Sequence, residues 1–175
     1  PRFWSVKKKG SIVESRRSST VPHAVLAGNG MTTPATQPIR VILIDDHAVV
    51  RAGLRMIIHN RAGMEIVGEA GNRGDALALT ASEHPDIILL DLDLGGDSGI
   101  ALIADLKSAA SEARIIILTG LRDSAVHRQA VLLGAMGMVG KEKAAEVLIS
   151  AIERVNAGEA WLDPSLMADV LSDMT

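Results

Sequence analysis

The chain has 175 residues, which on a prior of roughly 150 residues per domain is about one domain with a tail. Hydrophobic residues make up 47% of it and aromatic residues only 2%, so a core must be built from aliphatic side chains and Met. The absence of Cys excludes disulfides, thiolate chemistry and zinc–thiolate sites and fits a reducing cytoplasm. No apolar run approaches the roughly 18 residues of a membrane span, so we expect no membrane association.

The net charge of −3 hides an asymmetry along the chain. Residues 1–38 hold six basic and one acidic residue, or +5, which leaves 12 basic and 20 acidic residues, or −8, for the rest. An acidic body argues against nucleic-acid binding by the folded part. Residues 1–38 are also rich in Ser, Gly and Pro without sustained periodicity, so we expect a disordered basic tail rather than a signal peptide.

From Arg40 onward, short apolar runs alternate with helical patterns. Continuous apolar runs indicate strands covered on both faces, and a period of 3.6 residues indicates amphipathic helices. We expect residues 95–99 to form a loop and Gly134 to end a helix. The expected strands are Val41–Ile44, Ile66–Glu69, Ile87–Leu90, Ile115–Leu118 and Met136–Val139, and the expected helices are Val49–His59, Asp75–Glu83, Ile100–Ala109, Ser124–Leu133 and Ala144–Asn156.

This alternation of strands and helices predicts an α/β fold with a doubly wound, five-stranded parallel sheet of flavodoxin-like order 2-1-3-4-5. The predicted organisation is a basic tail over residues 1–38, a folded domain over 39–157, and a linker or the start of a C-terminal extension over 158–175. No Gly-x-Gly-x-x-Gly follows the first strand and no Walker loop is present, which argues against dinucleotide and P-loop nucleotide sites.

Polar residues follow four of the expected strands. Asp45 and Asp46 come after the first, Asp91 after the third, Thr119 after the fourth and Lys141 after the fifth. Because functional groups gather outside the carboxyl ends of parallel strands, we expect these side chains to converge at one rim of the sheet. Carboxylates suit a hard cation such as Mg²⁺ and one of them suits the role of nucleophile, while the hydroxyl and the amine suit phosphoryl oxygens.

Four segments carry a resemblance to a known family. They read Val-Ile-Leu-Ile-Asp-Asp-His-Ala-Val-Val-Arg-Ala-Gly-Leu-Arg (41–55), Asp-Ile-Ile-Leu-Leu-Asp-Leu-Asp-Leu-Gly-Gly (86–96), Gly-Ala-Met-Gly-Met-Val-Gly-Lys (134–141) and Gly-Glu-Ala-Trp-Leu-Asp-Pro (158–164). Together they resemble the receiver domain of two-component response regulators of the NarL/FixJ (LuxR-type) subfamily. The resemblance runs from about residue 40 to 164, and four blocks in order at fitting spacing make it very specific.

The resemblance implies a signalling domain that catalyses only its own phosphorylation and slow dephosphorylation. It implies Mg²⁺ as cofactor, a sensor histidine kinase as partner, possible homodimers and a cytoplasmic location. It also implies control of transcription through a helix-turn-helix domain that we expect to be absent from this chain. The implied roles are phospho-acceptor for Asp91, direct Mg²⁺ ligand for Asp46 and Asp91, water-mediated ligand for Asp45, backbone-carbonyl ligand for Asp93, and phosphoryl contacts for Thr119 and Lys141.

Departures from the family pattern keep a second hypothesis open. Gly95 replaces the usual Pro, which predicts a more flexible loop, Gly120 stands where Ala or Ser is common, and Met138 stands where an aromatic switch residue is frequent. These changes motivate a phosphorylation-independent interaction module. A third hypothesis, a haloacid-dehalogenase-like phosphohydrolase, needs an Asp-x-Asp near the first strand, whereas Asp91-Leu-Asp93 follows the third.

Two plainer interpretations concern the first acidic pair and its neighbour. Asp45 and Asp46 can be mere caps of the first helix. His47 can be a metal ligand or a base, but no second His is placed to join it, so we interpret it as positional.

Overall fold

The computed structural model describes residues 37–120, 123–143 and 145–173, so the predicted tail lies outside the described residues up to residue 36. A central sheet contains five parallel strands in the order β2-β1-β3-β6-β7. In chain order this is 2-1-3-4-5, which confirms the predicted doubly wound α/β fold. The strands are β1 (Ile39–Ile44), β2 (Met64–Ala70), β3 (Ile87–Asp91), β6 (Arg114–Thr119) and β7 (Ala135–Gly140).

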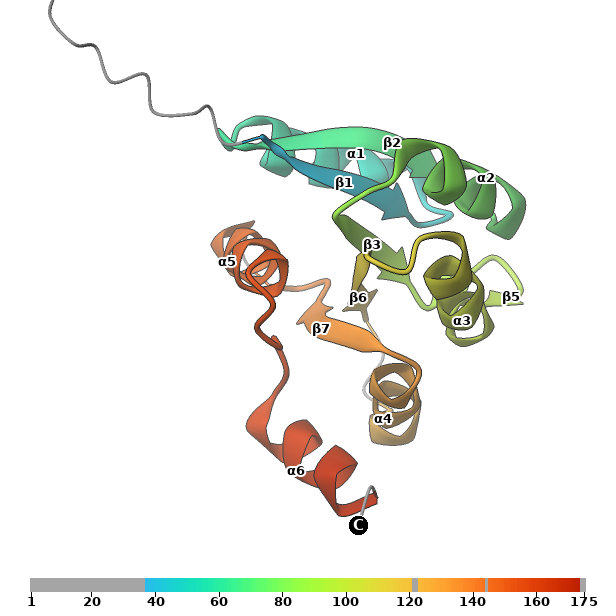
Figure 1. The fold of residues 1–175 in the computed structure, drawn as a ribbon, viewed down its shortest axis with the longest axis vertical. Coiled ribbons are helices and arrows are strands. Elements are labelled where there is room, and N and C mark those ends of the chain that lie inside the picture. The colour runs from blue at the N-terminus through green and yellow to red at the C-terminus, as the bar shows by residue number, and fades with distance from the viewer. Residues whose placement is uncertain (1–36, 121–122, 144, 174–175) are drawn as a thin grey trace, which may run out of the picture. The chain divides into compact units, whose positions relative to one another are not determined.

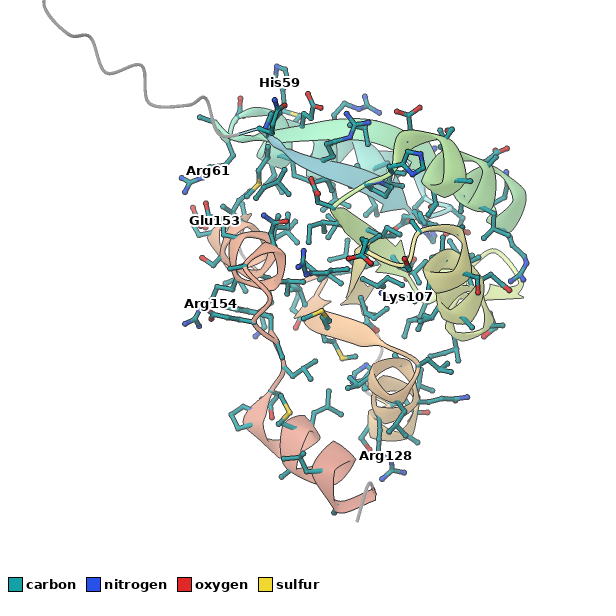
Figure 2. All side chains as sticks on the ribbon, in the orientation of Figure 1. His59, Arg61, Lys107, Arg128, Glu153 and Arg154 are labelled. Carbon is teal, nitrogen blue, oxygen red and sulfur yellow. The ribbon has the colours of Figure 1, made fainter. Side chains whose placement is uncertain are left out.

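Helices cover both faces of this sheet, as Figure 1 shows for α3 and α4 on one side of the strands and α5 on the other. Buried side chains on one sheet face pack with α1 and α5, and those on the opposite face pack with α2, α3 and α4. An ion pair of 2.6 Å between Arg61 Nη2 and Glu153 Oε1 also links the end of α1 to α5 (Figure 2). The bounds are α1 (Ala48–His59), α2 (Arg73–Glu83), α3 (Gly99–Ala109), α4 (Ser124–Leu132) and α5 (Ala145–Asn156).

Strand β1 shows why the apolar runs are continuous rather than alternating. Its side chains point to the two faces in turn. Ile42 and Ile44 join the core beneath α2 and α3, whereas Val41 and Leu43 join the core beneath α1 and α5. All four are almost completely buried, and each such side chain contributes roughly 1.5–3 kcal/mol relative to leaving it exposed. The Val41–Ile44 part of β1 therefore has no solvent-facing position at which a polar residue would be tolerated.

Helix ends were predicted less well than helix centres. Helix α2 begins two residues earlier than predicted, because the Asn72 side chain accepts a hydrogen bond of 2.9 Å from the Asp75 N–H and caps its first turn. Gly134 does end α4 as predicted, with φ at 107° and its N–H donating to Val131 O at 2.9 Å. The sequence pattern does not indicate the Asn72 cap, because Asn72 lies between the expected strand Ile66–Glu69 and the expected helix Asp75–Glu83.

Residues 95–99 do not form the single loop that the sequence predicted. Strands β4 (Asp93–Leu94) and β5 (Asp97–Ser98) pair antiparallel and form a small hairpin, and Gly99 already belongs to α3. Gly95 and Gly96 form its two-residue turn with φ of 61° and 111°. Positive φ at both central positions is characteristic of tight hairpin turns and favours glycine. The glycine that replaces the family's usual Pro therefore permits a defined turn.

The segment after α5 lies along the free edge of the sheet. The Trp161 N–H donates to Met136 O, and the Met138 N–H donates to Trp161 O, both at 2.9 Å. Helix α6 (Pro164–Asp173) follows and packs against α4. These contacts satisfy part of the otherwise unpaired edge of β7. Within the described residues, no helix is long and apolar enough to cross a membrane.

Restoring the family's usual residue at the hairpin is expected to destabilise this protein. Proline cannot adopt the positive φ of Gly95, so Gly95→Pro should lower the free energy of unfolding by about 1–3 kcal/mol, the typical cost of a disfavoured backbone conformation. Urea denaturation measures the loss. Gly95→Asn is the matched control, because Asn enters the left-handed region more easily and should cost less. Equal stability of the Pro variant and the wild type would contradict the hairpin.

Candidate functional site

One lysine joins two buried carboxylates at the carboxyl end of the sheet. The Lys141 Nζ donates to Asp45 Oδ2 at 2.8 Å and to Asp91 Oδ2 at 2.6 Å. Asp45 is 1% exposed and Asp91 is 3% exposed. Buried carboxylates need hydrogen bonds and a compensating charge, and Lys141 supplies both to the pair.

The register of the sheet brings these groups together. Ile44 pairs with Leu90 across β1 and β3, so the next residues, Asp45 just after β1 and Asp91 at the end of β3, lie side by side. On the other side, Thr119 ends β6 and is 5% exposed. The Lys141 N–H donates to Thr119 O at 2.9 Å, which carries the lysine just past the end of β7. The strand ends therefore present the acids, the hydroxyl and the amine along one rim.

A second group of ligand atoms adjoins this ion pair. One ligand atom from each of Asp45, Asp46, His47 and Asp91 lies within 4.8 Å of the others, an arrangement that can hold a metal ion. Asp46 Oδ1 is buried and lies 2.7 Å from His47 Nδ1, the distance of an ion pair. A buried carboxylate oxygen beside the other ligand atoms fits a hard cation, which binds through oxygen.

The helix-cap interpretation of the acidic pair is not supported. His47, and not either aspartate, occupies the N-cap position of α1, and its side chain makes no capping hydrogen bond. The Asp45 Oδ1 accepts from the His47 N–H at 2.7 Å, a bond that holds the turn between β1 and α1. The side chain of Asp93 is exposed and outside the metal-ligand group of the described residues, while its N–H donates to Asp91 Oδ1 at 3.2 Å.

Comparison with known proteins identifies the family. The family model described as the response regulator receiver domain matches residues 41–153. This chain belongs to that family. Its NarL/LuxR-type relatives include the DNA-binding transcriptional activator DevR/DosR of Mycobacterium tuberculosis, which is 35% identical over 136 residues. That match covers 78% of this chain and 63% of the relative, so the chain spans less than two thirds of the relative's length.

Solved receiver structures agree with this assignment. A LuxR-family two-component response regulator from Aurantimonas sp. SI85-9A1 superposes with a TM-score of 0.70 at 34% identity, covering 79% of this chain and 99% of that one. The isolated receiver domain of RcsB from Salmonella enterica serovar Typhimurium, solved with the phosphomimetic BeF₃⁻, gives 0.68 at 25% identity, covering 75% and 98%. The predicted resemblance to the NarL/FixJ (LuxR-type) subfamily is thus confirmed.

The electrostatics of this receiver domain favour a proton or a cation at the acidic site. Burial raises the pKa of Asp91 and the charge of Asp45 raises it further, although hydrogen bonds from Lys141 and from the Asp93 N–H oppose the change. Burial alone would lower the pKa of Lys141, but its hydrogen bonds to the two carboxylates and their charges outweigh that effect and raise it. Lys141 therefore stays an ammonium, while the ionised form of Asp91 is disfavoured.

Two residues that shape the receiver site were missed at the sequence level. The Arg51 Nη1 donates to the backbone carbonyl of Asp45 at 2.5 Å and so supports the end of β1. Gly99 passes so close to β3 that a Cβ there would lie 2.6 Å from Asp91 O and 2.6 Å from Leu92 Cα. Arg51 lies in the 41–55 segment that carries the family resemblance, so the sequence offered a signal that could have marked it as a site residue. A lone glycine at the start of a helix offers no such signal for Gly99.

The ionisation of Asp91 is expected to cost stability in the absence of metal. Since its pKa is raised in the fold, the folded state retains a proton on Asp91 where the unfolded chain has lost it. The stability of wild type relative to Asp91→Asn should therefore fall as the pH rises from the ordinary carboxyl range through the raised pKa. At neutral pH the variant should be more stable by about 0.5–2 kcal/mol.

Urea denaturation with a chelator from pH 4 to pH 8 measures this difference. Asp93→Asn is the matched control, because it makes the same chemical change at an exposed side chain outside the metal-ligand group of the described residues. An Asp91→Asn variant that is no more stable than wild type at neutral pH would contradict the argument.

Gly99 is expected to tolerate no side chain. The nearest atoms that a Cβ would meet are backbone atoms of Asp91 and Leu92, so Gly99→Ala must displace the backbone after β3 or the start of α3. Overpacking of this kind typically costs about 1–3 kcal/mol, which thermal or urea denaturation measures. Gly120→Ala is the control, since a Cβ added at Gly120 would meet no atom within 4 Å; equal effects of the two variants would refute the close approach.

Proposed function

We propose that this receiver domain is a Mg²⁺-dependent phosphorylation switch with Asp91 as phospho-acceptor. The observation that carries the proposal is the Lys141 Nζ, held between the carboxylates of Asp45 and Asp91 at 2.8 and 2.6 Å. The phosphoryl donor would be a phosphohistidine on a sensor histidine kinase. The proposal includes the cytoplasmic location expected for such a partner, and it treats the domain as a signalling device rather than a metabolic enzyme.

The transfer itself needs a nucleophile and charge compensation. An Asp91 carboxylate oxygen attacks the phosphorus, an O–P bond forms, the N–P bond of the donor breaks, and the departing imidazole takes a proton from water as needed. Asp46 and Asp91 would hold Mg²⁺, with Asp45 through water and the Asp93 backbone carbonyl as further ligands. When bound, the metal neutralises the charge that gathers between the two anionic reactants.

Lys141 is placed to bind the negative charge of Asp91 both before and after phosphorylation. In the unphosphorylated site it pairs with Asp91 Oδ2, and an aspartyl phosphate would move the negative charge outward onto the phosphoryl oxygens. An ammonium binds phosphoryl oxygen as readily as carboxylate, so Lys141 can remain paired throughout. The Thr119 hydroxyl would donate to another phosphoryl oxygen from the end of β6.

The expected output runs through the segment after Thr119. Helix α4 begins at Ser124, five residues on, and packs against α6 and β7. A movement of Thr119 toward the phosphoryl group would shift the start of α4, which is a local charge change with a wider structural effect. Met138 stands on β7 at the position where the resemblance expects an aromatic switch residue, and a flexible Met can repack instead.

The relatives support a role in the control of transcription. DevR/DosR is described as a DNA-binding transcriptional activator, and the RcsB receiver was solved with a phosphomimetic. We propose that this receiver likewise controls a DNA-binding output, with DNA contacted only by that output domain. A homodimer is compatible with the proposal but is not needed for it.

Acetyl phosphate provides the direct test. Incubation with Mg²⁺ should add one phosphoryl group to wild type by intact mass, because the small donor replaces the kinase. The adduct should be absent from Asp91→Asn and from samples with chelator, and present on Asp93→Asn. An unmodified wild type, under conditions that modify another receiver, would instead support the phosphorylation-independent interaction module.

A further inference from the structure

His47 belongs to the metal-ligand group. Among the described residues, its ring contacts Asp45 and Asp46 of that group. Its Nδ1 is 2.7 Å from Asp46 Oδ1 and 3.3 Å from Asp45 Oδ1. The side chain is 60% exposed and makes no capping bond, although the residue is the N-cap of α1. Capping is the usual function of a polar side chain at that position, so the ring is available for the acidic site.

The backbone holds this imidazole in place. The His47 N–H donates to Asp45 Oδ1 at 2.7 Å, which closes a tight turn directly after β1. The turn carries the ring to the side of the acids that Lys141 does not occupy, because Lys141 binds Asp45 Oδ2 and His47 faces Asp45 Oδ1. The Asp45 carboxylate thus separates an amine side of the site from an imidazole side.

The spacing on the imidazole side suits two ligands of one metal. Ligands bonded at about 2.1 Å are about 3.0 Å apart around an octahedral ion and about 3.4 Å apart around a tetrahedral ion such as Zn²⁺. The two Nδ1–oxygen distances are 2.7 and 3.3 Å, so the distance to Asp45 Oδ1 fits a tetrahedral ion as it stands and the distance to Asp46 Oδ1 requires a small opening. The closer oxygen, Asp46 Oδ1, is buried and lies at ion-pair distance from Nδ1, so a metal ion bound between the two atoms would take the place of the proton that such a pair shares.

We infer that His47 is a ligand residue that shifts the preference of this site from Mg²⁺ toward imidazole-binding divalent metals such as Zn²⁺. Mg²⁺ selects oxygen ligands and gains little from a ring nitrogen, whereas Zn²⁺ binds imidazole well. The inference rests on the metal site of the proposed function and adds a nitrogen ligand to its carboxylates. It concerns which metal occupies the site and not whether phosphorylation follows.

Separate titrations with Mg²⁺ and Zn²⁺ test the inference by calorimetry at fixed pH. His47→Ala should weaken Zn²⁺ binding about tenfold or more and Mg²⁺ binding less than about threefold, since only Zn²⁺ gains from the imidazole. His47→Gln should behave like the Ala variant, because a polar side chain that lacks the imidazole nitrogen cannot replace it as a Zn²⁺ ligand. His59→Ala is the matched control: His59 is exposed at the far end of α1 (Figure 2) and should change neither affinity.

The ¹⁵N resonances of the imidazole give a readout that does not depend on activity. Zn²⁺ should shift the Nδ1 resonance of His47, and Mg²⁺ should leave it in place. Equal weakening of both metals by His47→Ala, full Zn²⁺ affinity in His47→Gln, or an unshifted Nδ1 would each overturn the inference.

Asp46→Asn separates this result from the proposed function. If the His47 tests fail but Asp46→Asn still binds Mg²⁺ more weakly than wild type, only the ligand role of His47 is lost. If neither metal depends on Asp46, the metal site of the proposed function fails as well, and His47 has no site to act on.

Discussion

The site depends on one electrostatic constraint: two carboxylates are buried next to each other with a single ammonium between them. Asp45 and Asp91 are nearly inaccessible to water, and Lys141 bonds both. With Asp46 beside them, three acids face one base, so the unliganded site carries excess negative charge. Proximity of like charges disfavours ionisation, and the fold tolerates it because packing of the sheet supplies the compensating stability. A cation bound there would reduce this excess negative charge.

The surrounding backbone keeps the acids from moving apart. Neighbouring strands β1 and β3 fix the spacing of Asp45 and Asp91 through their register, and Arg51 bonds the carbonyl of Asp45. Gly99 brings the start of α3 against the backbone of Asp91, and the β4–β5 hairpin begins two residues after that acid. These backbone contacts therefore hold the charged groups close together despite their repulsion.

The rim has two chemically different sides. Lys141 and Thr119 lie toward β6 and β7, from which the chain continues into α4, and we assign the phosphoryl group to this side. His47 lies toward α1 and offers the only imidazole of the metal-ligand group within the described residues. Because one Asp45 oxygen faces Lys141 and the other faces His47, a change on either side alters the charge felt on the other.

The sequence by itself determined the fold and which residues lie at the carboxyl-end rim of the sheet, because both follow from local patterns. Buried runs such as Ile87–Leu90 mark strands, and topology rules for parallel sheets then place the residues that follow them together. Only the tertiary structure decided the hairpin turn at Gly95, the pairing of Trp161 with β7 and the close approach of Gly99. It alone also placed the His47 ring against the acids. These features depend on contacts between segments distant in the chain or on a particular backbone conformation, neither of which leaves a periodic signal in the residues themselves.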